Sequence, residues 1–189
     1  MTEVVTNNDH VDVLHNIINN AKKFVIFACP FWYTQEHPNE TVFSIFDDDI
    51  KAALNRDVDV LFICNEEFLE RLQTYYRPLY IQYNKKIKVY SPLDLYNSCY
   101  NSTLNFHGKV YANESECLIT SQNITGIGRS KDVGVHTDEV DLHMEALVWI
   151  GELFWADIPY KLVCFEDMIK DTYFGEYIEW YKQQKKYKT

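Results

Sequence analysis

The sequence predicts a layered α/β fold with a mixed central sheet. Amphipathic helical segments alternate along the chain with short apolar runs of strand length. Hydrophobic residues make up 47% of the 189 residues, which indicates a compact globule. A chain of this length supports one domain with an ordinary core. We therefore expect a single α/β/α domain over residues 1–189, with its core at about 11–156.

The first half contains three helix–strand steps. Apolar residues recur at helical spacing in 11–23, 42–55 and 66–77, and these segments predict three helices. Apolar runs follow at 24–29, 58–64 and 86–90, and they predict three strands. The first of these strands is stopped by Pro30. Together these elements indicate a sheet covered by helices.

The second half continues this pattern less regularly. Two strand-like runs lie at 106–112 and 118–125, and 145–150 reads as the last strand. The region 129–141 is polar and shows no clear periodicity. A long amphipathic helix is expected at 162–181, followed by a basic tail, and together they occupy the C-terminal part 160–189.

The charge of the chain limits how it can meet a polyanion. The formal net charge is −10, which repels nucleic acid over the surface as a whole. Binding therefore requires a local basic patch, and the alternative for each lysine group is a solvated surface. The candidate patches are 22–23, 85–88, 129–131 and 182–188.

The sequence also predicts where the protein is located and whether it binds a metal or a cofactor. The start of the sequence lacks the basic and apolar regions of a secretory signal, and no segment is long and uncharged enough to span a bilayer. We expect a cytoplasmic protein that does not bind membranes. The five cysteines are widely spaced, with no Cys-x-x-Cys pair, so we expect reduced thiols, no metal and no cofactor.

Four polar side chains are placed to converge on one pocket. His107 and Lys109 are two residues apart in a strand-like segment, so a strand would send both to one face. Ser121 and Asn123 repeat this spacing at the end of the next apolar run. An imidazole, an ammonium, a hydroxyl and an amide from neighbouring strands form a set suited to binding and attacking a phosphate.

The expected chemistry is nucleophilic. Attack of His107 on phosphorus would form a covalent phosphoenzyme, which divides one difficult displacement into two. Lys109, Ser121 and Asn123 would then stabilise the charge on the non-bridging oxygens without a metal. A second acid must protonate the leaving oxygen, and one copy of this stretch offers only one obvious imidazole.

These residues resemble the signature of the phospholipase D superfamily. That signature is His-x-Lys, then an Asp, then Gly-Ser-x-Asn; His107-Gly-Lys109 resembles its beginning and Ser121-Gln-Asn123 its end. The flanking helices and strands extend the resemblance over most of residues 11–150. Two positions depart from it. Glu114 falls where the family has its Asp and becomes the supporting acid, and Thr120 falls where Gly is usual.

The resemblance also implies an orienting carboxylate and a partner. His143-Met-Glu145 is similar to the Asn-x-Glu that follows the signature in family nucleases, which implies that Glu145 orients the catalytic histidine. Single-copy members form homodimers with one shared site, so His107 of each subunit would face its mate. One imidazole would act as nucleophile and the other as general acid.

The resulting prediction is a metal-independent phosphodiesterase, an endonuclease acting on DNA rather than RNA. One alternative keeps this chemistry but acts on a phospholipid headgroup or another small phosphodiester. The other alternative is a degenerate copy that serves as a DNA-binding or dimerisation module, and only Glu114 and Thr120 favour it.

Overall fold

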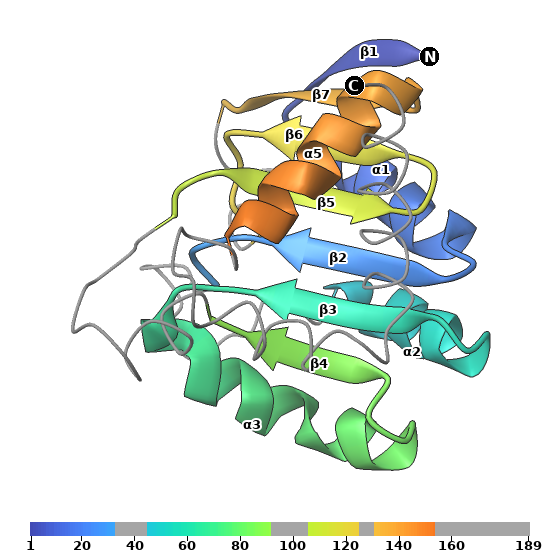
Figure 1. The fold of residues 1–189 in the computed structure, drawn as a ribbon, viewed down its shortest axis with the longest axis vertical. Coiled ribbons are helices and arrows are strands. Elements are labelled where there is room, and N and C mark those ends of the chain that lie inside the picture. The colour runs from blue at the N-terminus through green and yellow to red at the C-terminus, as the bar shows by residue number, and fades with distance from the viewer. Residues whose placement is uncertain (33–44, 92–105, 125–130, 154–189) are drawn as a thin grey trace, which may run out of the picture.

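The computed structural model describes residues 1–32, 45–91, 106–124 and 131–153 (Figure 1). Within these ranges the chain forms seven strands and four helices. The strands are β1 (Thr2–Thr6), β2 (Phe24–Ala28), β3 (Asp59–Ile63), β4 (Ile87–Tyr90), β5 (Lys109–Asn113), β6 (Cys117–Thr120) and β7 (Val133–Thr137). The helices are α1 (Asp9–Asn20), α2 (Asp47–Asn55), α3 (Glu66–Gln82) and α5 (Val140–Glu152).

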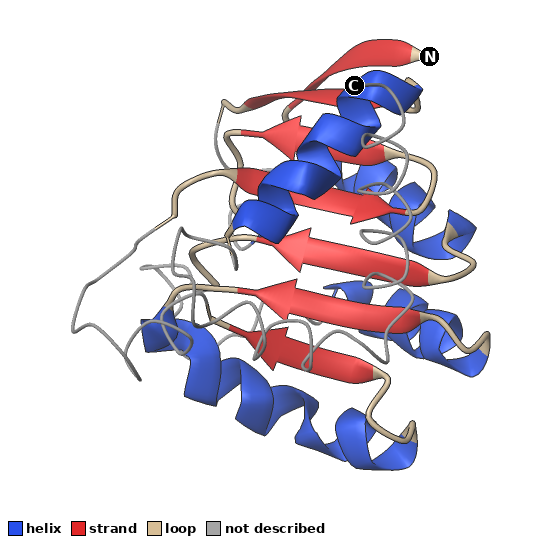
Figure 2. Ribbon diagram, viewed as in Figure 1, coloured by secondary structure: helices blue, strands red, loops and turns tan. Residues whose placement is uncertain are grey.

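The strands form one mixed sheet in the order β1-β7-β6-β5-β2-β3-β4. β2, β3 and β4 run parallel, and the other neighbouring pairs are antiparallel. Figure 1 shows α5 crossing one face, α1 and α2 behind the sheet, and α3 beside β4. Figure 2 shows the same layers by type of element. The predicted α/β/α layering with a mixed sheet is therefore confirmed.

A hydrophobic core lies on each face of the sheet. Every residue of β2 and of β3 is buried, so both faces of these central strands are covered. On the face of α1 to α3, the ring of Phe62 stacks on Phe27 at 4.9 Å and on Tyr76 at 4.5 Å between centroids. Burial of each such side chain contributes roughly 1.5–3 kcal/mol. The continuous apolar runs seen in the sequence are these two-sided strands.

The strands β1 and β7 were missed by the sequence analysis. In β7, Val133 and Val135 face solvent, while Gly134 and Thr137 are buried. In β1, Val4 is 70% exposed and Val5 is buried. Apolar side chains thus point outward along these strands, and this removes the usual alternation by which a half-buried strand is detected.

The run 145–150 was predicted to be a strand, and that prediction is wrong, because these residues lie within α5. The buried residues His143, Met144, Leu147 and Ile150 recur every three or four positions, which is the spacing of one helix face. A short apolar run alone does not separate a buried helix from a buried strand. The longer run 140–152 contains the helical pattern.

The edge strand β1 is tied to the sheet by a histidine between two carboxylates. His136 contacts Glu3 through Nδ1 at 3.0 Å and Glu116 through Nε2 at 2.8 Å. The hydrogen bond to Glu116 raises the pKa of His136, and the same bond lowers the pKa of the Glu116 carboxyl. The cluster links β1 and β7 to the turn between β5 and β6.

Other sequence predictions are settled only in part. Cys29, Cys64 and Cys117 are buried free thiols, as predicted, whereas Cys99 and Cys164 lie outside the described residues. The predicted helix at 162–181 and the basic tail also lie outside them. No helix in the described part of the chain is long and apolar enough to cross a membrane.

Candidate active site

His107 and Lys109 lie side by side at the start of β5. The strand begins at Lys109, so His107 lies in the extended segment before it and not inside a strand as the sequence suggested. The Nζ of Lys109 lies 3.2 Å from Nδ1 of His107. The His107 ring is exposed, whereas Lys109 is only 3% exposed. The buried ammonium of Lys109 therefore contacts the exposed imidazole of His107.

The glycine between these two residues is required by packing. A Cβ placed on Gly108 would lie 2.5 Å from Cη2 and from Cζ2 of Trp149, an indole on α5. Carbon atoms in ordinary contact are about 3.5–4.0 Å apart. The helix thus packs directly against the backbone that carries His107 and Lys109, and this contact positions both side chains.

Lys109 lies in a mixed electrostatic setting. Burial lowers the pKa of its ammonium, and the negative charge of Asp132, together with that of Cys29 when it is a thiolate, acts in the opposite direction. Burial also raises the pKa of the Cys29 thiol, so that this group is a hydrogen-bond donor at neutral pH. The Cys29 Sγ lies 3.2 Å from the carbonyl oxygen of Phe31 and 3.7 Å from Oδ1 of Asn123, and its one proton can be donated to either acceptor. The structure thus brings the Asn123 amide next to Cys29, beside Lys109.

Asp132 is a site residue that the sequence analysis did not find. It lies just before β7, and its Oδ1 accepts a hydrogen bond from the Ser121 hydroxyl at 2.8 Å. Its charge also acts on the pKa of Lys109. Asp132 thus connects Ser121 to the charge of Lys109. The signal that could have revealed it was the β-branched series Val133, Val135 and Thr137, which marks the next strand.

Glu145 reaches the site from a helix. It is an exposed residue of α5 and lines the same cavity as His107 and Lys109, of about 690 Å³. Among the described residues, the His107 ring contacts Lys109 and, edge-on at 6.0 Å between centroids, Phe31. No described carboxylate lies within hydrogen-bond distance of that ring.

Glu114 lies at the opposite end of β5 from the candidate site. The five residues of β5 separate it from Lys109 by roughly 16 Å, at about 3.3 Å per residue. Its carboxylate accepts hydrogen bonds from the backbone N–H groups of Lys22 and Lys23 at 2.7 and 3.2 Å, and of Phe24 at 3.3 Å. In this structure Glu114 closes the turn between α1 and β2, and it is not brought to His107.

Among the described residues of the predicted set, His107 and Lys109 are brought into direct contact, and Glu145 lines the same cavity. His107, Lys109 and Asn123 gather with Cys29 at the end of β2 where β5 begins, and Ser121 joins them through Asp132. No group of three or more His, Cys, Asp or Glu side chains in the described ranges is arranged to hold a metal ion. The set offers one nucleophile and several donors for an anion.

Comparison with known proteins identifies the fold. Neither the protein-family models nor the curated proteins that were compared match this sequence. Among solved structures, NucT from Helicobacter pylori has a TM-score of 0.55 at 17% identity, and the match covers 81% of this chain and 94% of that one. Nuc from Salmonella typhimurium, a phospholipase D family member, has a TM-score of 0.50 at 15% identity, with 81% and 92% covered.

A third structure extends the comparison to a larger protein. TrmBL2, an archaeal chromatin protein with a novel mode of DNA binding, has a TM-score of 0.52 at 13% identity. The match covers 80% of this chain and half of TrmBL2. At these identities the likeness concerns the fold. Together with the sheet order and the layers described above, it shows that the chain has the fold of the phospholipase D superfamily.

Proposed function

We propose that this protein is a metal-independent phosphodiesterase, an endonuclease that cleaves DNA through a phosphohistidine formed on His107. The observation that carries the proposal is the 3.2 Å contact between the buried Lys109 ammonium and the exposed His107 imidazole. The likeness to Nuc and NucT supports a phospholipase D-like phosphodiesterase or nuclease.

The contact between Lys109 and His107 suggests how the nucleophile becomes active. When the ammonium donates to Nδ1, the neutral ring carries its proton on Nε2 and has no free lone pair there. A phosphate oxygen is a stronger acceptor than an imidazole nitrogen, so a bound phosphodiester draws the Lys109 ammonium away. The proton can then occupy Nδ1, and the Nε2 lone pair attacks phosphorus.

The reaction proceeds in two displacements. The first forms an N–P bond at His107 and breaks the bond from phosphorus to the leaving oxygen, which takes a proton from a general acid. Water then attacks phosphorus and gives its proton to the same group, which now acts as a base, while the N–P bond breaks and the imidazole is restored. Lys109 and the Asn123 amide donate to the non-bridging oxygens, where negative charge grows in each transition state.

The second imidazole is proposed to come from a second copy of the chain. An exposed apolar row crosses the α5 face of the sheet edge: Ile119 of β6 pairs with Val135 of β7, which pairs with Val4 of β1. The three side chains are 41%, 36% and 70% exposed. Ile119 also lines the cavity that contains His107, so a copy docked on this row would lie beside the site.

The direct test is a cleavage assay in excess chelator. Purified protein is incubated with single- and double-stranded DNA and RNA, and His107→Ala is compared with His15→Gln. His15 is a suitable control because it lies on α1 and contacts Asp49. We expect cleavage of DNA by the wild type and by His15→Gln, and none by His107→Ala. Cleavage that stops on adding chelator, or that survives His107→Ala, would contradict the mechanism.

A binding module is the second candidate, and one comparison favours it. TrmBL2, which shares the fold, is an archaeal chromatin protein that binds DNA. A protein of this kind would bind DNA with a strong dependence on salt and would not cut it. The same cleavage assay, combined with DNA binding at several salt concentrations, separates the two functions.

A further inference from the structure

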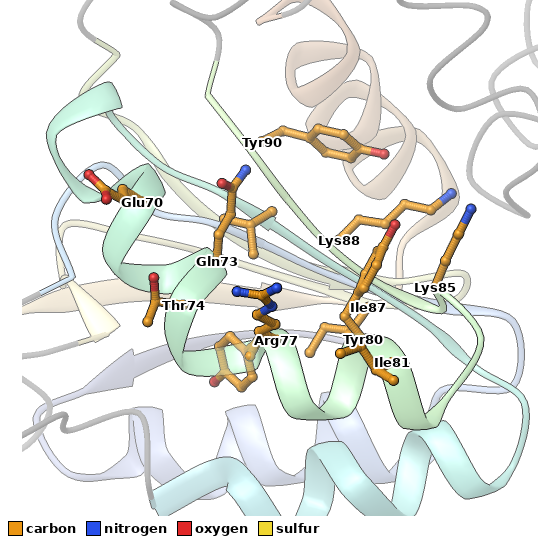
Figure 3. A pocket seen from close by; sticks show the side chains of 12 residues that line it. Glu70, Gln73, Thr74, Arg77, Tyr80, Ile81, Lys85, Ile87, Lys88 and Tyr90 are labelled. Carbon is orange, nitrogen blue, oxygen red and sulfur yellow. The ribbon is translucent and has the colours of Figure 1, made fainter.

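A second cavity lies between α3 and β4, and neither His107 nor Lys109 lines it. It has a volume of about 640 Å³, within the range of ligand sites. Figure 3 shows Arg77 and Tyr80 on α3, Lys85 at the turn that follows the helix, and Lys88 and Tyr90 on β4. We call these five residues the α3–β4 groove.

The groove holds one of its lysines in an unusual backbone conformation. Lys85 has a φ of 68°, in the left-handed region where glycine is the favoured residue. A residue with a side chain costs roughly 1 kcal/mol or more there. The Lys85 N–H donates to the carbonyl of Tyr80 at 2.9 Å, so a cation and an aromatic residue of the groove are joined through their backbones.

The charge of the groove differs from that of the chain as a whole. The chain has a net charge of −10, but three cationic side chains line this cavity, with Glu70 the single carboxylate among its described lining residues. The neighbouring Lys86 is paired with Asp57 and Asp59, each at 3.4 Å. Within the described part of the chain, Arg77 and Lys85 form no ion pair. A polyanion would find attraction here.

We infer that the α3–β4 groove binds a single strand of nucleic acid that continues from the candidate active site. This inference rests on the proposed function. Arg77, Lys85 and Lys88 would contact successive phosphates, and Tyr80, which is 40% exposed, would stack on a base. Interleaved cations and aromatic rings are the means by which proteins bind single strands without reading sequence.

The sheet register places one end of the groove, at Tyr90, at the same end of the sheet as the site, and the groove leads from there past Lys88 to Lys85 before the start of β4. Val110 of β5 pairs with Ala28, Ala28 pairs with Ile63, and Ile63 pairs with Tyr90. Tyr90 therefore lies at the same end of the sheet as Lys109, three strand spacings or about 14 Å away. At the duplex spacing of about 3.4 Å per nucleotide, a strand needs about four nucleotides to reach Tyr90, and more to reach Lys88 and Lys85.

The test compares two triple variants with the same change in charge. The groove variant is Arg77→Gln/Lys85→Gln/Lys88→Gln. The control is Lys22→Gln/Lys23→Gln/Lys51→Gln, whose lysines lie outside the groove, two between α1 and β2 and one on α2. Affinity for a fluorescent single-stranded DNA of about 12 nucleotides is measured from low to high salt.

The groove variant should bind this DNA at least about tenfold more weakly, and the slope of log affinity against log salt should fall by about 2, or about 0.7 for each lost contact. The control should change affinity by less than about twofold. A DNA of about three nucleotides should bind both variants equally, because it cannot reach the groove. Equal losses in both variants, a loss confined to duplex DNA, or a change only in oligomeric state would overturn the inference.

One further variant separates binding from folding. Lys85→Gly removes the charge and also relieves the left-handed backbone, so it should weaken DNA binding while the melting temperature stays equal or rises. Hydrolysis of bis-p-nitrophenyl phosphate should be unchanged in the groove variants. If the wild type cleaves no phosphodiester but still binds DNA through the groove, the proposed activity fails and this inference stands. If the wild type cleaves DNA and the groove variant binds DNA as tightly as the wild type does, the proposed activity stands and this inference fails.

Discussion

The contact between Gly108 and Trp149 leads to the most specific structural prediction. A Cβ at position 108 would lie 2.5 Å from two atoms of the indole, which is about 1 Å closer than ordinary carbon contact. Gly108→Ala therefore forces α5 or the His107 segment to shift. Overpacking of this kind costs about 1–3 kcal/mol in the free energy of unfolding. A displacement of His107 by about 1 Å should also lower the cleavage rate by roughly 100-fold.

The assay is a double-mutant cycle with Trp149→Phe, measured by urea unfolding and by DNA cleavage. Phenylalanine lacks the outer part of the indole that the new methyl would meet. In the Trp149→Phe background, Gly108→Ala should therefore lower the free energy of unfolding by less than about 0.5 kcal/mol. The coupling energy between positions 108 and 149 should equal the difference between the costs of Gly108→Ala in the two backgrounds.

A matched control is Gly134→Ala. A Cβ there would lie 2.9 Å from Cβ of Thr120 and 3.0 Å from the Ile119 carbonyl, with no contact to Trp149. This variant should be destabilised to the same extent in both backgrounds. If Gly108→Ala also costs the same with tryptophan and with phenylalanine at position 149, the packing argument is refuted.

Three further predictions follow from the described contacts. His136 has a pKa raised by Glu116, so its contribution to stability is complete below the unfolded value of about 6.5 and is lost as pH rises through the folded value. The Glu116 carboxyl has a lowered pKa, so its contribution to stability is present above a pH of about 4.5. His136→Gln should therefore lower the free energy of unfolding, measured with urea, by about 1–2 kcal/mol near pH 6 and by less near pH 9. Asp132→Asn should reduce cleavage by at least about tenfold, because Ser121 loses a charged acceptor; wild-type cleavage with unchanged stability would exclude a role for Asp132. When His107→Ala and wild-type chains are mixed and allowed to exchange, cleavage should fall as the square of the wild-type fraction, and a linear fall would argue against a shared site.

The central part of the fold was predictable because of how its strands are covered. β2 and β3 are buried on both faces, so they appear in the sequence as continuous apolar runs, and helices precede them. The sheet edge at β7 and β1 was not predictable in the same way. There Val4, Val133 and Val135 face outward, and the pairing of these strands depends on contacts distant in sequence.

The candidate site was predictable where spacing alone fixes proximity. His107 and Lys109 are two residues apart, and extended backbone at β5 brings their side chains together. Asp132 could not be found without knowing that β7 exists, because its position depends on where that strand begins. Glu145 lines the cavity with His107, as the sequence predicted, but it does so from a helix and not from a strand. Glu114 matches a motif position in the sequence, yet its side chain lies away from the site, at the turn between α1 and β2.

The stereochemistry of cleavage at phosphorus tests the central claim most directly. Each in-line displacement inverts the configuration of phosphorus, so attack by His107 followed by attack by water returns the original configuration. A DNA substrate with one chiral phosphorothioate is cleaved in isotopically labelled water, and the product configuration is determined. A phosphohistidine at His107 predicts net retention. Net inversion would mean a single direct attack by water and would contradict a phosphohistidine at His107.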